Sequence, residues 1–451
     1  MRNVAVLGGG GLRTPLLIHG IAQSQAALEI GELRLYDIDP RRAEIMAGLG
    51  REIVRKLGAD IRITTQPSVE SAVEGVDFVL SSLRVGGMAA RARDEGIAML
   101  HGLAGQETTG PGGLAMALRT VPVALEHARV IEKAAPHAWY INFTNPAGLI
   151  TQALSQLSQV RVIGICDTPA ELFHRIAWAL GEPSERVVCD YAGLNHLGWV
   201  RGVTVNGRDV TDEILGNIEL LRGLYSADLF DPELIRVLRL IPTEYLFFYY
   251  SQRKAYRNQV RAGTTRGAEL ERMNTALFAE MQTQDAAASL ITYRNYLNQR
   301  NASYMKLEAE AGTAFGNAHQ EDDPFMGATG YHRIAVEVMT GLVSETPREV
   351  VVNVRNEGSI ADLEDDDIVE VPCHITTGGA RPAHIGKLPE AVRGLVLAVK
   401  AYERTAIRAA VARSGDLAQL AMLELPIVGQ WEIAREIREA LDRSDPGLFR
   451  Q

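Results

Sequence analysis

From Asn3 to Ile165 the chain alternates short apolar runs with longer amphipathic stretches. The apolar runs predict strands at Asn3–Leu7, Leu33–Asp37, Ile61–Thr65, Asp77–Ser81, Trp139–Asn142 and Val162–Ile165. Between them, apolar positions recur with a helical period, for example over Arg41–Leu57 and Ala115–Ala134. Strands that alternate with helices of this length predict an α/β fold built on a doubly wound parallel sheet.

The pattern changes after about residue 185. We expect strand, turn and strand over Val187–Val205, mainly helices over 212–345, strands over Glu349–Pro372, and helices from Leu388 to Leu441. The acidic run Asp362–Asp367 predicts a solvated turn. We therefore expect two domains, a parallel α/β domain over 1–185 and an α+β domain over 186–451.

Composition and charge indicate a globular protein and argue against some classes of function. Hydrophobic residues make up 46% of the 451 residues, and the net charge is −10, which argues against a basic surface for nucleic acid. No apolar run is long enough to predict a membrane span, and the N-terminal run is too short for a signal peptide. The chain has three cysteines, an odd and sparse set that favours a reducing compartment. We expect a cytoplasmic protein.

A glycine run directly follows the first predicted strand and precedes a helix. The run and the two residues after it are Gly8, Gly9, Gly10, Gly11, Leu12 and Arg13. Without side chains, these glycines let a pyrophosphate approach the amides at a helix N-terminus. The strict fingerprint has a third glycine where Arg13 stands, so the match is partial. The alternative is a glycine turn that binds nothing.

Asp37 ends the second predicted strand, where a carboxylate can accept hydrogen bonds from both ribose hydroxyls. This favours NAD over NADP, although Arg41 and Arg42 leave NADP open. Asn145-Pro146 follows the fifth strand, at the edge where such sheets present ligand groups. The order of strand, glycines, helix and acid predicts a Rossmann-like domain that binds NAD.

Several further segments carry reactive side chains. They are RVGGMAARARDE at 84–95, GQETTGPGG at 105–113, NFTNPAGLIT at 142–151, GICDTP at 164–169 and GLNHLGW at 193–199. Together with the glycine run, they resemble glycoside hydrolase family four, the NAD- and metal-dependent family of 6-phospho-glycosidases, α-glycosidases and α-galacturonidases. The resemblance continues in PTEYLFFYY at 242–250, NEGSI at 356–360, VEVP at 369–372 and GKLP at 386–389. Any one motif would be weak, but the combination is specific.

The resemblance implies that Cys166 and His196 bind manganese. A cysteine and a histidine so far apart in the sequence would otherwise indicate a buried thiol and a hydrogen-bonded histidine. Two protein ligands leave a cation positions for substrate hydroxyls. The implied reaction begins with hydride transfer from sugar C3 to NAD. A base then removes the C2 proton and the aglycone leaves from C1. Water addition and reduction of the ketone complete the cycle.

The C2 base of the family matches Tyr245 best, with Tyr249 and Tyr250 as register alternatives. A phenol needs a nearby cation to act as a base near neutral pH. Asp167 matches the general acid of α-acting members, whereas β-acting members commonly have asparagine there. The segments 142–151 and 191–199 look more like the β-acting branch, so the resemblance slightly favours the β-anomer.

The remaining candidates are polar or cationic groups for the sugar. Glu107, Asn145 and Asn195 are candidate ligands of sugar hydroxyls, or alternatively turn residues and helix caps. Phosphate-recognising members often carry Ser or Thr after the glycines, where this chain has Leu12-Arg13. Arg13 is able to grip a phosphate or a carboxylate with two hydrogen bonds. Arg84, Arg91 and Arg266 are further candidates for an anionic group.

Three classes of function follow from these motifs. The first is a glycosidase for 6-phospho-β-glucosides that uses NAD and Mn²⁺, with uronides and neutral glycosides as alternatives. The second is an NAD-dependent hydroxyacid dehydrogenase of the lactate or malate type, which would release NADH stoichiometrically. The third is a sensor that kept the fold and lost the chemistry. The resemblance also implies a homodimer or a homotetramer.

Overall fold

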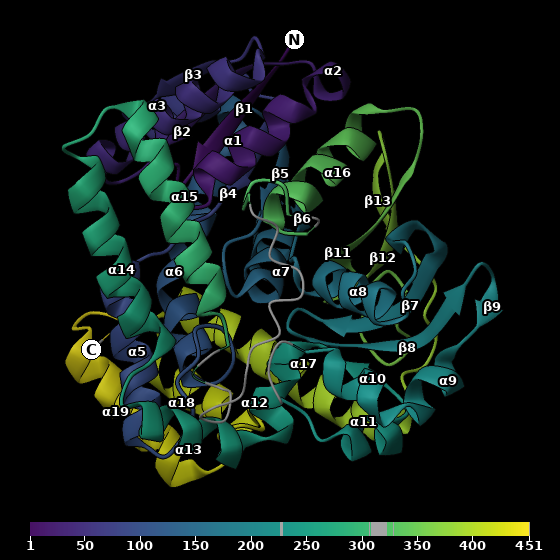
Figure 1. Ribbon diagram of the computed structural model, residues 1–451. Helices are drawn as coiled ribbons and strands as arrows, with labels where there is room; N and C mark the ends of the chain where they lie inside the picture. The colour runs from purple at the N-terminus through teal and green to yellow at the C-terminus, as the bar shows by residue number, and fades with distance from the viewer. Residues whose placement is uncertain (226–228, 306, 308–322, 328, 451) are drawn as a thin grey trace.

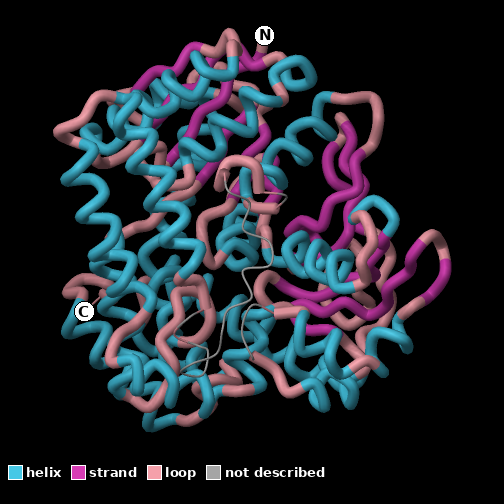
Figure 2. Tube along the Cα trace, in the orientation of Figure 1, coloured by secondary structure: helices cyan, strands magenta, loops and turns pink. Residues whose placement is uncertain are grey.

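The computed structural model describes residues 1–225, 229–305, 307, 323–327 and 329–450, and the strands within these residues join into one mixed sheet. Figure 1 shows the first strands of this sheet at the top, beside the N-terminus, and the later strands at the right. In Figure 2 the magenta strands form a band between these two regions, with helices packed around it.

The first half of the sheet is parallel and has the strand order β3-β2-β1-β4-β5-β6. Its strands are Arg2–Leu7 (β1), Ile30–Tyr36 (β2), Arg62–Thr65 (β3), Phe78–Ser81 (β4), Trp139–Asn142 (β5) and Arg161–Gly164 (β6). All of β4 is buried, as expected for a central strand covered on both faces. Each predicted strand overlaps an observed one, and the Rossmann-like fold class is confirmed.

Most helices of this half fall into two packed groups. They are Thr14–Gln23 (α1), Gln25–Leu28 (α2), Pro40–Leu57 (α3), Val69–Val73 (α4), Gly87–Leu100 (α5), Pro111–Ala134 (α6), Ala147–Leu157 (α7) and Thr168–Ala179 (α8). Helix α1 contacts α3, whereas α6 contacts α4, α5 and α7. Helix α3 begins where the Asp39 carboxylate accepts hydrogen bonds from the next amides, and it ends at Gly58 in the left-handed conformation.

The second half of the sheet is antiparallel and continues directly from β6. Its strands are Val187–Leu194 (β7), Leu197–Val205 (β8), Arg208–Asp209 (β9), Ile241–Pro242 (β10), Arg348–Arg355 (β11), Ile368–Thr376 (β12) and Gly379–Pro382 (β13). Gly164 of β6 pairs with Asn353 of β11, and Glu370 of β12 pairs with Gly193 of β7. The expected α+β character of the later chain is confirmed.

The remaining helices come from the later chain. They are Ser184–Arg186 (η1), Thr211–Gly216 (α9), Ile218–Gly223 (α10), Pro232–Leu238 (α11), Glu244–Leu246 (η2), Phe247–Tyr250 (α12), Gln252–Ala262 (α13), Arg266–Met281 (α14), Ala286–Ala302 (α15), Tyr331–Val343 (α16), Glu390–Ala412 (α17), Gly415–Glu424 (α18) and Trp431–Ser444 (α19). Helix α14 contacts α5, and α15 contacts α3, so both cover the parallel half (Figure 1). The boundary at residue 185 stays a prediction.

The acidic run 362–367 differs from its prediction as a solvated turn. Asp367 is fully buried, and its carboxylate accepts hydrogen bonds from Arg404 Nε at 2.9 Å and from the Glu364 amide at 3.0 Å. The prediction is wrong for this residue because Asp367 closes the turn and neutralises a cation from α17. No helix in the described ranges combines the length and apolarity needed to cross a membrane.

Candidate active site

The glycine run forms the turn between β1 and α1, at the carboxyl edge of the parallel strands. Gly8 has φ +85°, and a Cβ there would lie 2.4 Å from the Ser82 carbonyl oxygen. A Cβ on Gly10 would lie 2.9 Å from the Asp37 carboxylate. A side chain at either position would force its neighbours to move, so the turn presents bare backbone to which a pyrophosphate could come close.

The other predicted dinucleotide contacts lie beside this turn. Asp37 Oδ2 accepts a hydrogen bond from the Gly10 amide at 2.9 Å, which fixes the acid against the glycine run. The Leu12 carbonyl accepts a hydrogen bond from the Tyr293 hydroxyl at 2.5 Å. Asn145 Oδ1 is buried and lacks a partner within the described residues. These groups fit a bound dinucleotide, and their individual roles stay predictions.

Cys166 follows β6 at the same edge of the sheet. Its thiol is buried and donates a hydrogen bond to Thr168 Oγ1 at 3.3 Å. Burial raises the pKa of this thiol, and the charges of Glu370 and Asp167 raise it further. A divalent cation would reverse this effect, because a coordinating thiol is deprotonated by its metal.

His196 lies in the two-residue turn between β7 and β8 and has φ +60°. The Thr108 hydroxyl donates to Gln106 Oε1 at 2.9 Å and lies 2.8 Å from His196 Nδ1. Because the hydroxyl hydrogen goes to Gln106, His196 Nδ1 donates its hydrogen to Thr108 and Nε2 keeps a lone pair. Burial lowers the pKa of His196 to about 4, so the ring is neutral at neutral pH.

The lone pair on His196 Nε2 makes a metal site physically reasonable. Nε2 is buried and has no hydrogen-bond partner in the part of the chain that the structure describes. A neutral imidazole nitrogen and a buried thiol form a donor pair suited to a transition-metal ion. The hydrogen bond on Nδ1 is the type of contact that orients metal-binding histidines.

Tyr245 packs directly on His196. Strand β10 pairs with β8, and this pairing holds the following turn, η2, beside the turn that carries His196. The two rings stack with centroids 3.7 Å apart and an angle of 4° between planes. Burial raises the pKa of Tyr245 well above its usual value, with further contributions from Glu107, Glu244 and Cys166. The predicted base and the predicted metal ligands therefore converge.

The two register alternatives lie among other neighbours. Burial raises the pKa of Tyr249, and the charge of Glu403 acts on the same group. Burial raises the pKa of Tyr250 to about 12. The contact with His196 favours Tyr245 among the three tyrosines.

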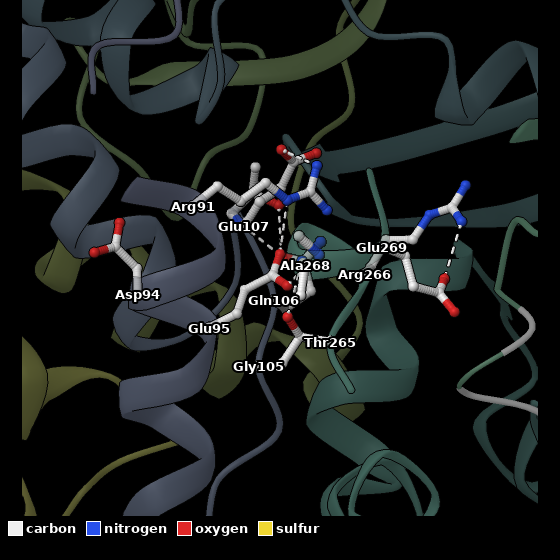
Figure 3. A network of polar contacts seen from close by, with 12 residues as sticks. Arg91, Asp94, Glu95, Gly105, Gln106, Glu107, Thr265, Arg266, Ala268 and Glu269 are labelled. Carbon is white, nitrogen blue, oxygen red and sulfur yellow. Dashed lines mark hydrogen bonds and ion pairs between the residues drawn. The ribbon is translucent and has the colours of Figure 1, made fainter. Parts of the chain in front are cut away.

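Glu107 joins two of the predicted substrate-binding arginines. Its carboxylate lies 2.6 Å from Arg84 Nη2 and 2.8 Å from Arg91 Nη1. Arg91 also pairs with Glu95 at 2.7 Å, and Figure 3 shows Arg91, Glu95 and Glu107 together. Although burial opposes the ionised form, Arg91 and Arg84 hold the pKa of Glu107 well below its usual range. Both guanidinium groups are thus already neutralised by carboxylates.

Arg13 lies within the same site. Its guanidinium is 3.8 Å from the Tyr331 ring centroid and 3.9 Å from Asp167 Oδ2. Although burial opposes the charge of Arg13, Tyr331, Asp167 and Glu107 raise its pKa. Burial also raises the pKa of Asp167, and Arg13 partly offsets this effect. A carboxyl with a raised pKa suits a proton donor, as the family resemblance implies for Asp167.

Arg266 is engaged in contacts within the protein. It donates hydrogen bonds to Ser303 Oγ at 2.8 Å and to the Arg300 carbonyl at 2.9 Å. Its guanidinium also lies 3.4 Å from Glu269, and Figure 3 shows that pair apart from the pair of Arg91 and Glu107. Arg266 therefore supports the end of α15, and its substrate-binding role stays a prediction.

Comparison with known proteins identifies the family. The model described as "Family 4 glycosyl hydrolase" matches residues 3–182, and that of the family's C-terminal domain matches residues 191–428. The chain belongs to the family 4 glycosyl hydrolases. It is therefore a glycoside hydrolase, and the predicted family and enzyme class are confirmed.

Relatives within the family cover the whole chain. A protein of Bacillus subtilis named "Probable 6-phospho-beta-glucosidase" is 32% identical over 97% of this chain and 95% of its own. The 6-phospho-alpha-glucosidase 1 of Lacticaseibacillus paracasei is 27% identical, over 97% and 96% respectively. The 6-phospho-beta glucosidase structure from Thermotoga maritima with manganese, NAD⁺ and glucose-6-phosphate is 29% identical, covers both chains fully and has a TM-score of 0.84.

Sequence reasoning gave no role to a buried carboxylate of this family 4 enzyme. Glu370 is 1% exposed and accepts hydrogen bonds from Tyr191 at 2.7 Å, Asn353 at 2.9 Å and Asn195 at 3.1 Å. Its charge also acts on Cys166. Asn195 thus orients toward Glu370, and its predicted contact with the sugar stays a prediction. The VEVP motif at 369–372 was the only sequence signal for this carboxylate.

A second missed residue is Arg300, in the last turn of α15. Burial lowers the pKa of its guanidinium, and the positive charges of Arg13 and Arg266 lower it further. Its side chain forms no hydrogen bond or ion pair within the described ranges. The spacing of Tyr293, Tyr296 and Arg300 places the three on one face of the helix, and this spacing was a usable signal.

Proposed function

We propose that this family 4 glycosyl hydrolase cleaves 6-phospho-β-glucosides and uses NAD and Mn²⁺. The observation that carries the proposal is the convergence of Tyr245, the bare His196 Nε2 and the Cys166 thiol. The relative with 32% identity is named for the β-linked substrate, and the T. maritima structure contains both cofactors and glucose-6-phosphate. The α-linked substrate, named for the relative with 27% identity, is the alternative.

The phosphate part of the proposal rests on Arg300 and Arg13. Two guanidinium groups lie close enough for the charge of Arg13 to lower the pKa of Arg300, after the larger effect of burial. Two like charges this close repel each other, so such a pair favours an anionic ligand between its members. A sugar phosphate supplies that charge and accepts bidentate hydrogen bonds from guanidinium groups. A uronate carboxylate would satisfy the same groups with fewer oxygens.

The proposal gives each group of the site a role. When bound, the dinucleotide supplies a reversible hydride acceptor and the cation supplies a Lewis acid for sugar oxygens. Cys166 and His196 would hold the cation, and the glycine run with Asp37 would hold the dinucleotide. Tyr245 would take the C2 proton, and Asp167 would give a proton to the leaving oxygen. Arg13 and Arg300 would fix the far end of the sugar.

A colorimetric assay tests the proposed function. We expect the protein, with NAD, Mn²⁺ and a thiol reductant, to release p-nitrophenol from p-nitrophenyl β-glucoside 6-phosphate without accumulation of NADH. Parallel reactions with the α-anomer, the unphosphorylated glucoside and the galacturonide identify the substrate class. NADH formed in step with oxidation of lactate or malate, and no p-nitrophenol from any glycoside, would instead favour a dehydrogenase.

Replacing Arg300 by glutamine tests the phosphate site. We expect KM for the 6-phosphorylated substrate to rise about tenfold, because one charge-assisted contact is lost, while kcat changes less. The variant should be no less stable without substrate, since a half-buried cation that is repelled by Arg13 and Arg266 is removed. The matched control is Arg294→Gln on the same helix, where Arg294 pairs with Asp323 at 3.3 Å. An unchanged KM in Arg300→Gln would contradict the assignment.

We further propose that the enzyme works in the cytoplasm as a homodimer or homotetramer. The three cysteines are all unpaired and buried, which is compatible with a reducing compartment. The oligomeric state follows from the family resemblance alone.

A further inference from the structure

A hydrogen-bonded chain of side chains leads away from the Tyr245 hydroxyl. The Tyr304 hydroxyl lies 3.4 Å from the Tyr245 hydroxyl and donates a short hydrogen bond to Glu244 Oε1. Glu244 immediately precedes Tyr245 in η2, whereas Tyr304 follows the end of α15. The contact therefore joins the turn that carries the predicted base to the turn that follows α15.

The single hydroxyl hydrogen of Tyr304 determines what this chain can do. While that hydrogen is donated to Glu244, the Tyr304 oxygen facing Tyr245 can only accept. Tyr245 as a phenol then donates to Tyr304, whereas Tyr245 as a phenolate accepts from Tyr304 only when the Tyr304 hydrogen turns from Glu244 to Tyr245. In either state the Tyr245 oxygen is held from one side, and its remaining lone pairs face away from Tyr304.

The stacked ring of His196 also restrains Tyr245. The ring of Tyr245 lies 3.7 Å from that of His196, which fixes its plane, but stacking leaves the hydroxyl hydrogen free to turn about the C–O bond. A hydrogen bond to Tyr304 removes that freedom. Proton abstraction from carbon depends on such alignment, because the base must meet the C–H bond at close range and on its axis.

We propose that Glu244 and Tyr304 are positioning residues that act through Tyr245 and orient its oxygen toward the sugar C2. This proposal rests on the proposed function, in which Tyr245 takes the C2 proton. Glu244 orients the Tyr304 hydroxyl, and that hydroxyl orients the Tyr245 oxygen, so the two residues act in series on the same group.

The surroundings of Glu244 support this role over a purely structural one. Burial raises its pKa to about 7, while Arg175 and the hydrogen bond from Tyr304 act in the opposite direction. The carboxyls of Glu171 and Asp167 also act on it and raise its pKa. Glu244 is therefore a part-buried carboxyl whose ionisation is unfavourable at this position beside the site. Within the described residues, the side chain that donates a hydrogen bond to it is Tyr304.

The test is Tyr304→Phe, which keeps the ring and removes the hydroxyl. We expect kcat to fall about tenfold with little change in KM, since orientation of the base affects the chemical step alone. The primary isotope effect with substrate deuterated at C2 should increase, because proton abstraction becomes more rate-limiting. Glu244→Gln should show a smaller loss, since the amide oxygen can still accept from Tyr304. The double variant Glu244→Gln/Tyr304→Phe should have the same kcat as Tyr304→Phe, because the effects of two substitutions in one hydrogen-bonded chain do not add.

The control is Tyr225→Phe, since the buried Tyr225 hydroxyl donates only to the Pro242 carbonyl, at 2.7 Å, within the described residues. This variant should leave the C2 isotope effect unchanged even where it lowers the melting temperature. Wild-type kcat and isotope effect in folded Tyr304→Phe would overturn the proposal, and if that variant does not fold, Glu244→Gln decides the question by the same measurements. A wild-type protein that cleaves no p-nitrophenyl glycoside would instead overturn the proposed function.

Discussion

Replacing Cys166 by serine is expected to abolish glycoside cleavage, with kcat lowered at least about a thousandfold. A serine hydroxyl does not ionise to form the soft, anionic ligand that a thiolate provides. A Lewis-acidic ion contributes several kcal/mol of transition-state stabilisation, and a tenfold change in rate corresponds to about 1.4 kcal/mol. The measurement is p-nitrophenol release at increasing Mn²⁺, which should restore little activity in the variant.

The control for this experiment is Cys189→Ser. Cys189 is a buried thiol on β7, and its raised pKa has burial as its cause, with no active-site group acting on it. It should retain activity and Mn²⁺ dependence. NAD affinity, measured by fluorescence titration, should be nearly the same in both variants because the glycine run and Asp37 are untouched. A fully active Cys166→Ser enzyme would remove the metal assignment.

The fold of the parallel half was predictable because its signals are local. Each parallel strand is a short apolar run between helical patterns, as at Phe78–Ser81, where every residue is buried. The strand bounds were less accurate, as with Leu33–Asp37 for the observed β2, because its pairing with β1 already begins at Ile30, ahead of the apolar run. The connections through helices restrict the order of the parallel strands, which is seen in the structure as β3-β2-β1-β4-β5-β6.

The continuation of the sheet was not predictable in the same way. The pairing of Gly164 with Asn353 joins residues that are far apart in the sequence, and no local pattern specifies it. Likewise, the burial of Asp367 depends on Arg404 in α17, so the acidic run alone suggested a solvated turn. The pairing and the burial both depend on tertiary contacts, and the sequence near each residue does not indicate its partner.

In the candidate site too, some residues could be placed from the sequence and others only from the structure. Cys166, Asp37 and Asn145 follow parallel strands, and the carboxyl ends of these strands meet at one edge, so their proximity could be inferred. Arg300 lies in the last turn of α15 and Tyr304 in the turn that follows it, and their proximity to the site required the tertiary structure. The family motifs located His196 and Tyr245, but the contact between their rings was visible only in the structure.

Replacing Tyr245 by phenylalanine is expected to lower kcat by roughly two to four orders of magnitude, the usual contribution of a positioned general base. Phenylalanine keeps the aromatic ring, so its stacking on His196 and the site geometry should persist. KM should change little, because the lost hydroxyl acts in the transition state rather than in binding. Activity near that of wild type would show that another group takes the C2 proton.

The same variant separates the two halves of the proposed reaction. Hydride transfer from C3 does not use the Tyr245 hydroxyl, so rapid mixing with substrate should still produce the near-ultraviolet absorbance of reduced nicotinamide, bound to the enzyme, without release of p-nitrophenol. In Cys166→Ser that signal should be lost together with turnover, because the cation polarises the oxygen at the carbon that is oxidised. If both variants lost the signal equally, Tyr245 would be needed before proton abstraction, and its assignment as the C2 base would be wrong.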